Sequence, residues 1–169
     1  GNAYKEAKEV VDATYSTGST STASCFNFSN SLTTNRKDYN SIIMTFFKST
    51  CYEDYLPYMT KGNDVVLVVN TTNLFGDEAG ADDRNLDLFG DWDGGDIKYS
   101  LKYDIKEGTS GTDMIPAIRL SEMYYIMGEY FAYKDEFSKA GEMLDKVRYA
   151  RGISTTHLAS SIGSLEVFH

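Results

Sequence analysis

The sequence predicts a mainly α-helical fold, with helical hairpins, long loops and a few short strands. Two observations lead to this prediction. Apolar residues recur at helical spacing near both ends of the chain, over residues 2–15 and 114–153. The stretch between them, 16–113, is rich in Gly, Ser, Asp and Asn and holds only short apolar runs. The 169 residues fit a single domain, or a fragment of a larger one.

Composition excludes several classes of protein. The net charge is −9, and a field of that sign repels phosphate backbones, so nucleic acid is not an expected partner. Aromatic residues make up 14% and charged residues 24%, which is typical of a globular chain. No apolar run approaches the about 18 residues of a membrane-spanning helix. Because the chain starts inside a helical pattern and ends without terminating chemistry, we expect it to be an internal fragment.

The first helix is expected over 2–15, where Ala and Val alternate with Lys and Glu at helical spacing. An exposed polar loop is expected over 16–24. Residues 41–47 fit either a strand or half of a helix. Further predictions are a strand at 65–69, a long irregular acidic loop over 75–96 and a strand at 97–103.

The last part of the chain predicts a helical hairpin. Its first helix is expected to begin near Pro116 and to end near Tyr133, and its second to run from Asp135 to Arg151, with Gly152 as the stop. The spacing of small and large residues agrees with the tetratricopeptide pattern, so the fold class expected is a tetratricopeptide-like α-α superhelix. The residues that match this pattern are Tyr124, Met127, Gly128, Phe131, Ala140, Leu144 and Val147.

Charges interrupt the apolar face of this hairpin. Arg119, Glu122 and Glu129 stand at helical spacing, and Arg148 follows on the second helix. One interpretation makes the two glutamates an acid/base pair of a glycosidase, which needs an open cleft between them. The interpretation we favour is a structural charge network that joins the arginines to the glutamates in the seam of the hairpin.

Metal and thiol chemistry has little support. Cys25 and Cys51 are the only cysteines, and their spacing is not that of a zinc site. Two free buried thiols and one disulfide both remain open. Asp91, Asp93 and Asp96 suggest calcium, but their spacing departs from the EF-hand pattern, so a solvated acidic loop and no cofactor are expected.

The hairpin residues also carry a family resemblance. "IPAIRLSEMYYIMGE" (115–129) and "AGEMLDKVRYARGI" (140–153) resemble the C-terminal part of the SusD-like (SusD/RagB) family. Asp83-Arg84 and Lys102-Tyr103 resemble motifs that precede this hairpin in the family. Gly128 stands where the family usually has Ala, and Asp145 where it usually has Asn.

The resemblance implies a non-enzymatic, surface-exposed outer-membrane lipoprotein that binds oligo- or polysaccharide such as starch. It implies delivery of the glycan to a TonB-dependent transporter, and a membrane contact only through an N-terminal lipid anchor that this chain lacks. Trp92 between Asp91 and Asp93 suits sugar binding, although a packing anchor explains it as well. The alternative function is a tetratricopeptide-type scaffold for protein–protein interaction, and no catalytic residue is expected.

Overall fold

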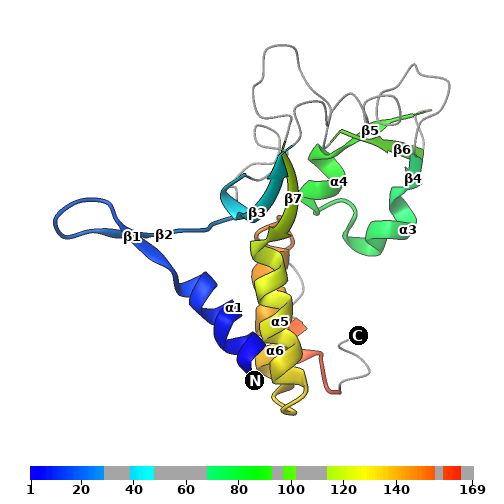
Figure 1. Ribbon diagram of the computed structural model, residues 1–169. Helices are drawn as coiled ribbons and strands as arrows, with labels where there is room; N and C mark the ends of the chain where they lie inside the picture. Colours follow the sequence, from blue (N-terminus) through cyan, green and yellow to red (C-terminus); the bar gives the residue numbers. More distant parts are fainter. Residues whose placement is uncertain (29–38, 48–67, 93–96, 102–113, 155–157, 165–169) are drawn as a thin grey trace. The chain divides into compact units, whose positions relative to one another are not determined.

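The computed structural model describes residues 1–28, 39–47, 68–92, 97–101, 114–154 and 158–164 (Figure 1). The chain divides into two compact units. Unit 1 comprises Gly1–Phe28, Asn40–Ile43 and Ile118–His169, and unit 2 comprises Ser29–Tyr39 and Met44–Ala117.

The prediction of a mainly α-helical, tetratricopeptide-like superhelix is wrong. The described residues are 50% helical and 23% strand, and the strands form three small antiparallel sheets. The error lies in the middle of the chain. The three-residue strands Thr14–Ser16, Thr22–Ser24 and Phe89–Asp91 are too short to show a periodic pattern, so the sequence predicts loops there.

Unit 1 contains three helices, namely α1 (Asn2–Asp12), α5 (Leu120–Ala132) and α6 (Phe137–Tyr149). The helices α5 and α6 form a hairpin, and α1 packs on α5 (Figure 1). Small residues lie at the contacts, because Ala140 is fully buried and Gly128 and Ala7 are also buried. The helical hairpin and its small-residue seam are therefore confirmed, although the superhelix is not.

Aromatic rings hold α1 against the hairpin. The ring of Tyr4 stacks on that of Tyr130, with centroids 4.3 Å apart, and meets that of Phe131 edge-on at 5.4 Å. The ammonium group of Lys139 lies 5.5 Å from the centroid of the Phe131 ring. The apolar face that the sequence predicted for α1 is confirmed in part, because Ala7 is buried and Val10 and Val11 are half-buried, whereas Ala3 is exposed.

Gly152 ends α6 as predicted. Its φ of 84° is in the left-handed region, where glycine carries no steric penalty. The N–H of Ile153 donates to the carbonyl of Arg148 at 3.2 Å, and the N–H of Gly152 donates to that of Tyr149 at 3.1 Å. This is the pair of bonds of a Schellman motif.

The start of the hairpin differs from the prediction. Pro116 lies in strand β7 (Met114–Arg119), which pairs with β3 (Ile42–Phe47), and α5 begins only at Leu120. Both strands of a two-stranded sheet are edges, so a proline without an N–H is tolerated there. The ambiguity at 41–47 is thereby settled in favour of a strand.

The polar stretch after α1 is a hairpin rather than a loop. Strand β1 (Thr14–Ser16) pairs antiparallel with β2 (Thr22–Ser24), and the N–H of Thr17 donates to the carbonyl of Ser21 at 2.9 Å. Nearly every residue of both strands is exposed. Because neither face is apolar, the sequence shows no alternation that would predict a strand.

Unit 2 is built on a three-stranded antiparallel sheet in the order β4-β6-β5. Its elements are β4 (Val68–Asn70), α3 (Thr71–Phe75), the 3-10 helix η2 (Gly76–Glu78), α4 (Asp83–Asp87), β5 (Phe89–Asp91) and β6 (Ile97–Ser100). The strands predicted at 65–69 and 97–103 are confirmed in their described parts, but the irregular loop predicted over 75–96 is wrong. Asp82 caps α4 by accepting a bond from the N–H of Arg84, which explains a helix inside this acidic stretch.

In the described part of the chain, every helix is too short or too polar to cross a membrane.

Candidate functional site

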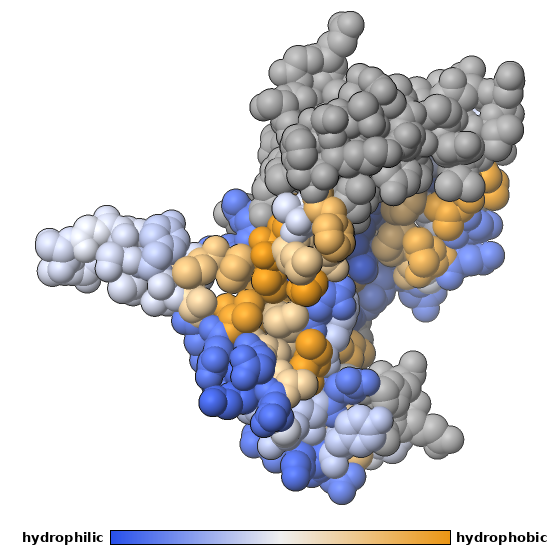
Figure 2. All heavy atoms as spheres, viewed as in Figure 1, coloured by the Kyte–Doolittle hydropathy of each residue, from blue (hydrophilic) through white to orange (hydrophobic). Residues whose placement is uncertain are grey.

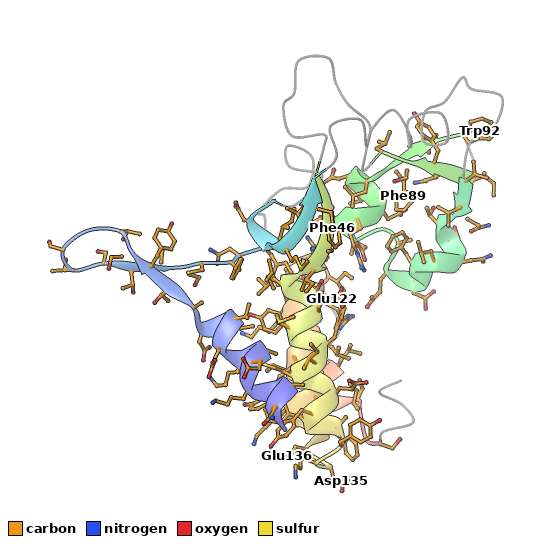
Figure 3. All side chains as sticks on the ribbon, viewed as in Figure 1. Phe46, Phe89, Trp92, Glu122, Asp135 and Glu136 are labelled. Atoms are coloured by element: carbon orange, nitrogen blue, oxygen red, sulfur yellow. The ribbon has the colours of Figure 1, made fainter. Side chains whose placement is uncertain are left out.

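The four charges predicted to form a network do not come together among the described residues. Arg148 Nη1 donates to Asp145 Oδ1 at 2.9 Å, while Glu122 and Glu129 are exposed on α5 (Figure 3). Arg119 Nη1 donates to Ser41 Oγ at 3.5 Å. Since Arg119 belongs to β7 and precedes the helix, the helical spacing from which the network was inferred does not apply to its side chain.

Asp145 is an anchor in unit 1 rather than a catalytic acid. Its carboxylate is buried and accepts the backbone N–H groups of Leu158 and Ala159 at 3.0 and 3.2 Å, in addition to the bond from Arg148. Burial by itself raises the pKa of Asp145, but the bonds from Leu158, Ala159 and Arg148 lower it more, so the pKa lies below its usual value. The contacts of this carboxylate fasten the 3-10 helix η3 (Leu158–Ser160) to α6.

Trp92 and Asp91 lie at the end of β5 in unit 2. The N–H of Trp92 donates to the carbonyl of Ile97 at 3.1 Å, and its side chain is half-buried. Asp91 is exposed, and Lys98 Nζ lies 4.0 Å from its carboxylate. Asp93, the third residue predicted to bind ligand, lies outside the described residues.

The calcium alternative depends on Asp91, Asp93 and Asp96, and the last two also lie outside the described ranges. Within those ranges no group of three or more His, Cys, Asp or Glu side chains could hold a metal ion. Cys25 is exposed and free, which fits neither the buried thiol nor the disulfide that the sequence left open, and Cys51 lies outside the described residues.

The structure adds a pocket to unit 2 that the sequence did not predict. It has a volume of about 300 Å³ and lies among α3, α4, β5 and β6. Figure 2 shows apolar residues gathered in the region of α3 and α4. The residues that line the pocket are Leu74, Phe75, Arg84, Leu88, Phe89 and Ser100.

A buried carboxylate holds the arginine of this pocket. Arg84 Nη2 donates to Asp82 Oδ2 at 2.6 Å, and Arg84 Nε donates to Asp82 Oδ1 at 3.0 Å. The Asp82 side chain is 1% exposed, whereas that of Arg84 is 41% exposed. This two-point geometry fixes the plane of the guanidinium group.

Two aromatic rings complete the fixed part of the wall. The guanidinium carbon of Arg84 lies 5.5 Å from the centroid of the Phe75 ring. The rings of Phe75 and Phe89 meet edge to face, with centroids 5.9 Å apart. The guanidinium group of Arg84 and the rings of Phe75 and Phe89 therefore hold one another in place.

The pocket and the polar end of β5 share one face of the sheet. Phe89 pairs with Ser100 and Asp91 with Lys98, and residues two apart on a strand point to the same face. On the other face, a Cβ added to Gly90 would lie 2.7 Å from the Tyr99 ring, so that ring covers the strand there. Figure 3 shows Trp92 at the end of β5 that lies away from Phe89.

The sequence contained part of this signal. An Asp that precedes a short helical stretch is a common N-cap, and Asp82 stands in that position before Asp83 and Arg84. Nothing in the spacing connects these residues with Phe75 or Ser100, because the contact arises only when the sheet forms.

Comparisons of the chain with protein-family models, with curated proteins and with solved structures find no match.

Proposed function

We propose that this chain is part of a non-enzymatic glycan-binding protein of a polysaccharide-uptake system at the outer membrane, as its resemblance to SusD-like proteins implies. The observation that carries the proposal is the set of aromatic and polar side chains along β5. Trp92 and the exposed Asp91 stand at one end of this strand, and an aromatic-lined pocket stands at the other.

These residue types match the chemistry of sugars. The C–H face of a sugar ring packs on an aromatic ring, and hydroxyl groups bond to carboxylate oxygens and ammonium groups. Asp91 Oδ1 and Lys98 Nζ are 4.0 Å apart, so a carboxylate and an ammonium group stand side by side at this end of β5. The proposal gives these groups a binding role and assigns no catalytic residue.

The rest of the proposal follows from the resemblance of residues 115–129 and 140–153. It places the parent protein at the cell surface with a lipid anchor and makes a TonB-dependent transporter its partner. The described helices α5 and α6 are consistent with the helical hairpin that this resemblance implies.

A tetratricopeptide-type scaffold is the alternative. Such a scaffold needs stacked helix pairs of about 34 residues each, because one repeat cannot bury its apolar face alone. In the described residues, α5 and α6 form one such pair, and α1 covers its side. The short strands and helices in the rest of the described residues therefore favour the glycan-binding proposal.

A Trp92→Ala substitution tests the proposal. Full-length protein is titrated calorimetrically with the polysaccharides that score on a glycan array. Loss of ring stacking should weaken binding about tenfold. Tyr133→Ala is the matched control, because Tyr133 is a 66% exposed aromatic residue in unit 1, and it should leave affinity unchanged.

Two results would contradict the proposal. Equal affinities of the Trp92→Ala and Tyr133→Ala proteins would remove Trp92 from the site. Tight binding of a peptide without binding of any polysaccharide would favour the scaffold.

A further inference from the structure

The lining of the unit 2 pocket is a poor match for a bare sugar ring. Leu74, Leu88, Phe75 and Phe89 provide most of the wall, and their side chains neither donate nor accept hydrogen bonds. A hexose has hydroxyl groups around its ring, and each one placed against such a wall without a partner is unfavourable. The polar end of β5 suits the sugar part of a ligand, and the pocket suits an apolar part.

Charge also limits what the pocket can take. Arg84 is the cation among the described residues of the lining, and the buried carboxylate of Asp82 compensates it at 2.6 Å. An anionic ligand thus meets a nearly neutral wall in a chain of net charge −9. The balance favours an uncharged ligand.

We infer that the pocket takes a small uncharged aromatic group that bears one polar oxygen. Its volume of about 300 Å³ is at the lower end of the range for ligand pockets, which suits a single substituted ring. Phe75 and Phe89 both line it, and their rings meet edge to face, an arrangement that aromatic rings favour. Among the described residues of the lining, Arg84 and Ser100 carry polar side chains, so the oxygen of the ligand lies on their side of the pocket.

The inference extends the proposed function and rests on it for the sugar part only. Phe89 and Asp91 are two residues apart on β5 and lie on the same face of the sheet, which places them about 7 Å apart along the strand. A ligand made of one sugar ring and one aromatic ring can span that distance. The glycan class that follows is one whose sugars carry neutral aromatic substituents, such as aryl esters.

Small probes test the pocket directly. Full-length protein is titrated with phenyl β-D-glucoside, methyl β-D-glucoside, methyl 4-hydroxybenzoate and 4-hydroxybenzoate, with calorimetry or ligand-observed NMR as the readout. Phenyl glucoside should bind about tenfold more tightly than methyl glucoside, because its ring is buried. The neutral ester should bind more tightly than the carboxylate. Equal binding of the two glucosides, or preference for the carboxylate, would overturn the inference.

A pair of matched variants locates the binding. Leu74 lines the pocket and is 58% exposed, so Leu74→Phe fills the pocket without overpacking a core. Leu86 is 57% exposed on α4 and does not line the pocket, so Leu86→Phe is the control. Leu74→Phe should weaken phenyl glucoside binding about tenfold, and Leu86→Phe should not. Equal effects of the two changes, in proteins with equal melting temperatures, would place the ring elsewhere and refute the inference.

The probes also separate failure of the pocket from failure of the proposed function. If methyl 4-hydroxybenzoate binds in a Leu74-dependent way and no polysaccharide binds, the pocket stands and the glycan proposal fails. If polysaccharides bind in a Trp92-dependent way and no aromatic probe does, the glycan proposal stands and the inference about the pocket fails.

Discussion

A Gly141→Ala substitution tests the contact between α6 and η3. Gly141 is buried within α6, and a Cβ built on it would lie 2.4 Å from Ala159 Cα and 2.5 Å from Ala159 N. These are backbone atoms, so no side chain can rotate out of the way. To accept the methyl group, the η3 backbone must retreat until the separation reaches the 3.4 Å at which ordinary contact begins.

The magnitude follows from two opposing effects. Alanine is favoured over glycine inside a helix by about 1 kcal/mol. The retreat of η3, however, stretches the bonds of 3.0 and 3.2 Å that Leu158 and Ala159 donate to Asp145. Bonds to a charged group contribute about 1.5–3 kcal/mol each, so we expect a net loss of about 2–5 kcal/mol when both are broken. For a chain of this size that lowers the melting temperature by about 10 °C.

The assay is urea unfolding followed by circular dichroism, with calorimetry for the melting temperature. Gly163→Ala is the control, because a Cβ there meets nothing within 4 Å, and it should change the unfolding free energy little. If Gly141→Ala is as stable as the control, or gains the about 1 kcal/mol of helix propensity, the close approach of η3 to α6 is wrong.

Two further predictions concern buried carboxylates. An Asp145→Asn protein should lose about 2 kcal/mol of stability at pH 7, where the wild-type carboxylate is ionised. Because the folded pKa of Asp145 is lowered, its contribution is present above the unfolded pKa of about 3.9 and is lost as the pH falls through the folded pKa. The difference in unfolding free energy between the wild type and Asp145→Asn, measured by urea unfolding, should therefore shrink below about pH 4. A difference that stays constant down to about pH 3 would show that the Asp145 carboxylate does not stabilise the fold in its ionised form. In unit 2, Arg84→Met should cost about 2 kcal/mol, because it leaves the buried Asp82 unpaired, whereas Asp82→Asn keeps an N-cap acceptor and should cost about 1 kcal/mol. Both are measured by thermal melts, and the reverse order would show that Arg84, which is 41% exposed, does not compensate Asp82.

Periodicity predicted the helices of unit 1 well. The apolar face of α1, the small-residue seam at Ala140 and the stop at Gly152 all follow from local spacing and backbone preference. It failed at Pro116, because a proline fits a first helical turn and an edge strand equally well. It failed at β1 and β2 because exposed polar strands leave no alternation in the sequence.

The site was less predictable than the fold. Trp92 and Asp91 were predicted to bind ligand from residue type alone, and that prediction stays a prediction. The pocket depends on contacts among α3, α4, β5 and β6 that no single stretch encodes. The charge network was predicted from helical spacing on the assumption of one continuous helix from Pro116. Arg119, however, lies in β7. The partner that Arg148 does bind, Asp145, is three residues away on the same helix, and the groups that Asp145 anchors lie beyond Gly152.

The division of the chain also has a consequence for biosynthesis. Unit 1 is assembled from separate segments of sequence, so α1 leaves the ribosome long before its partner α5, which begins at Leu120. At usual translation rates the delay is about 5–20 s, which is long compared with helix formation. Throughout that interval the Tyr4 face of α1 lacks its partner α5, and a chaperone that shields aromatic residues has time to bind there. Unit 2, whose described elements from β4 to β6 follow one another directly, can complete its sheet first. The most regular helices of this protein are therefore among the last parts to find their partners.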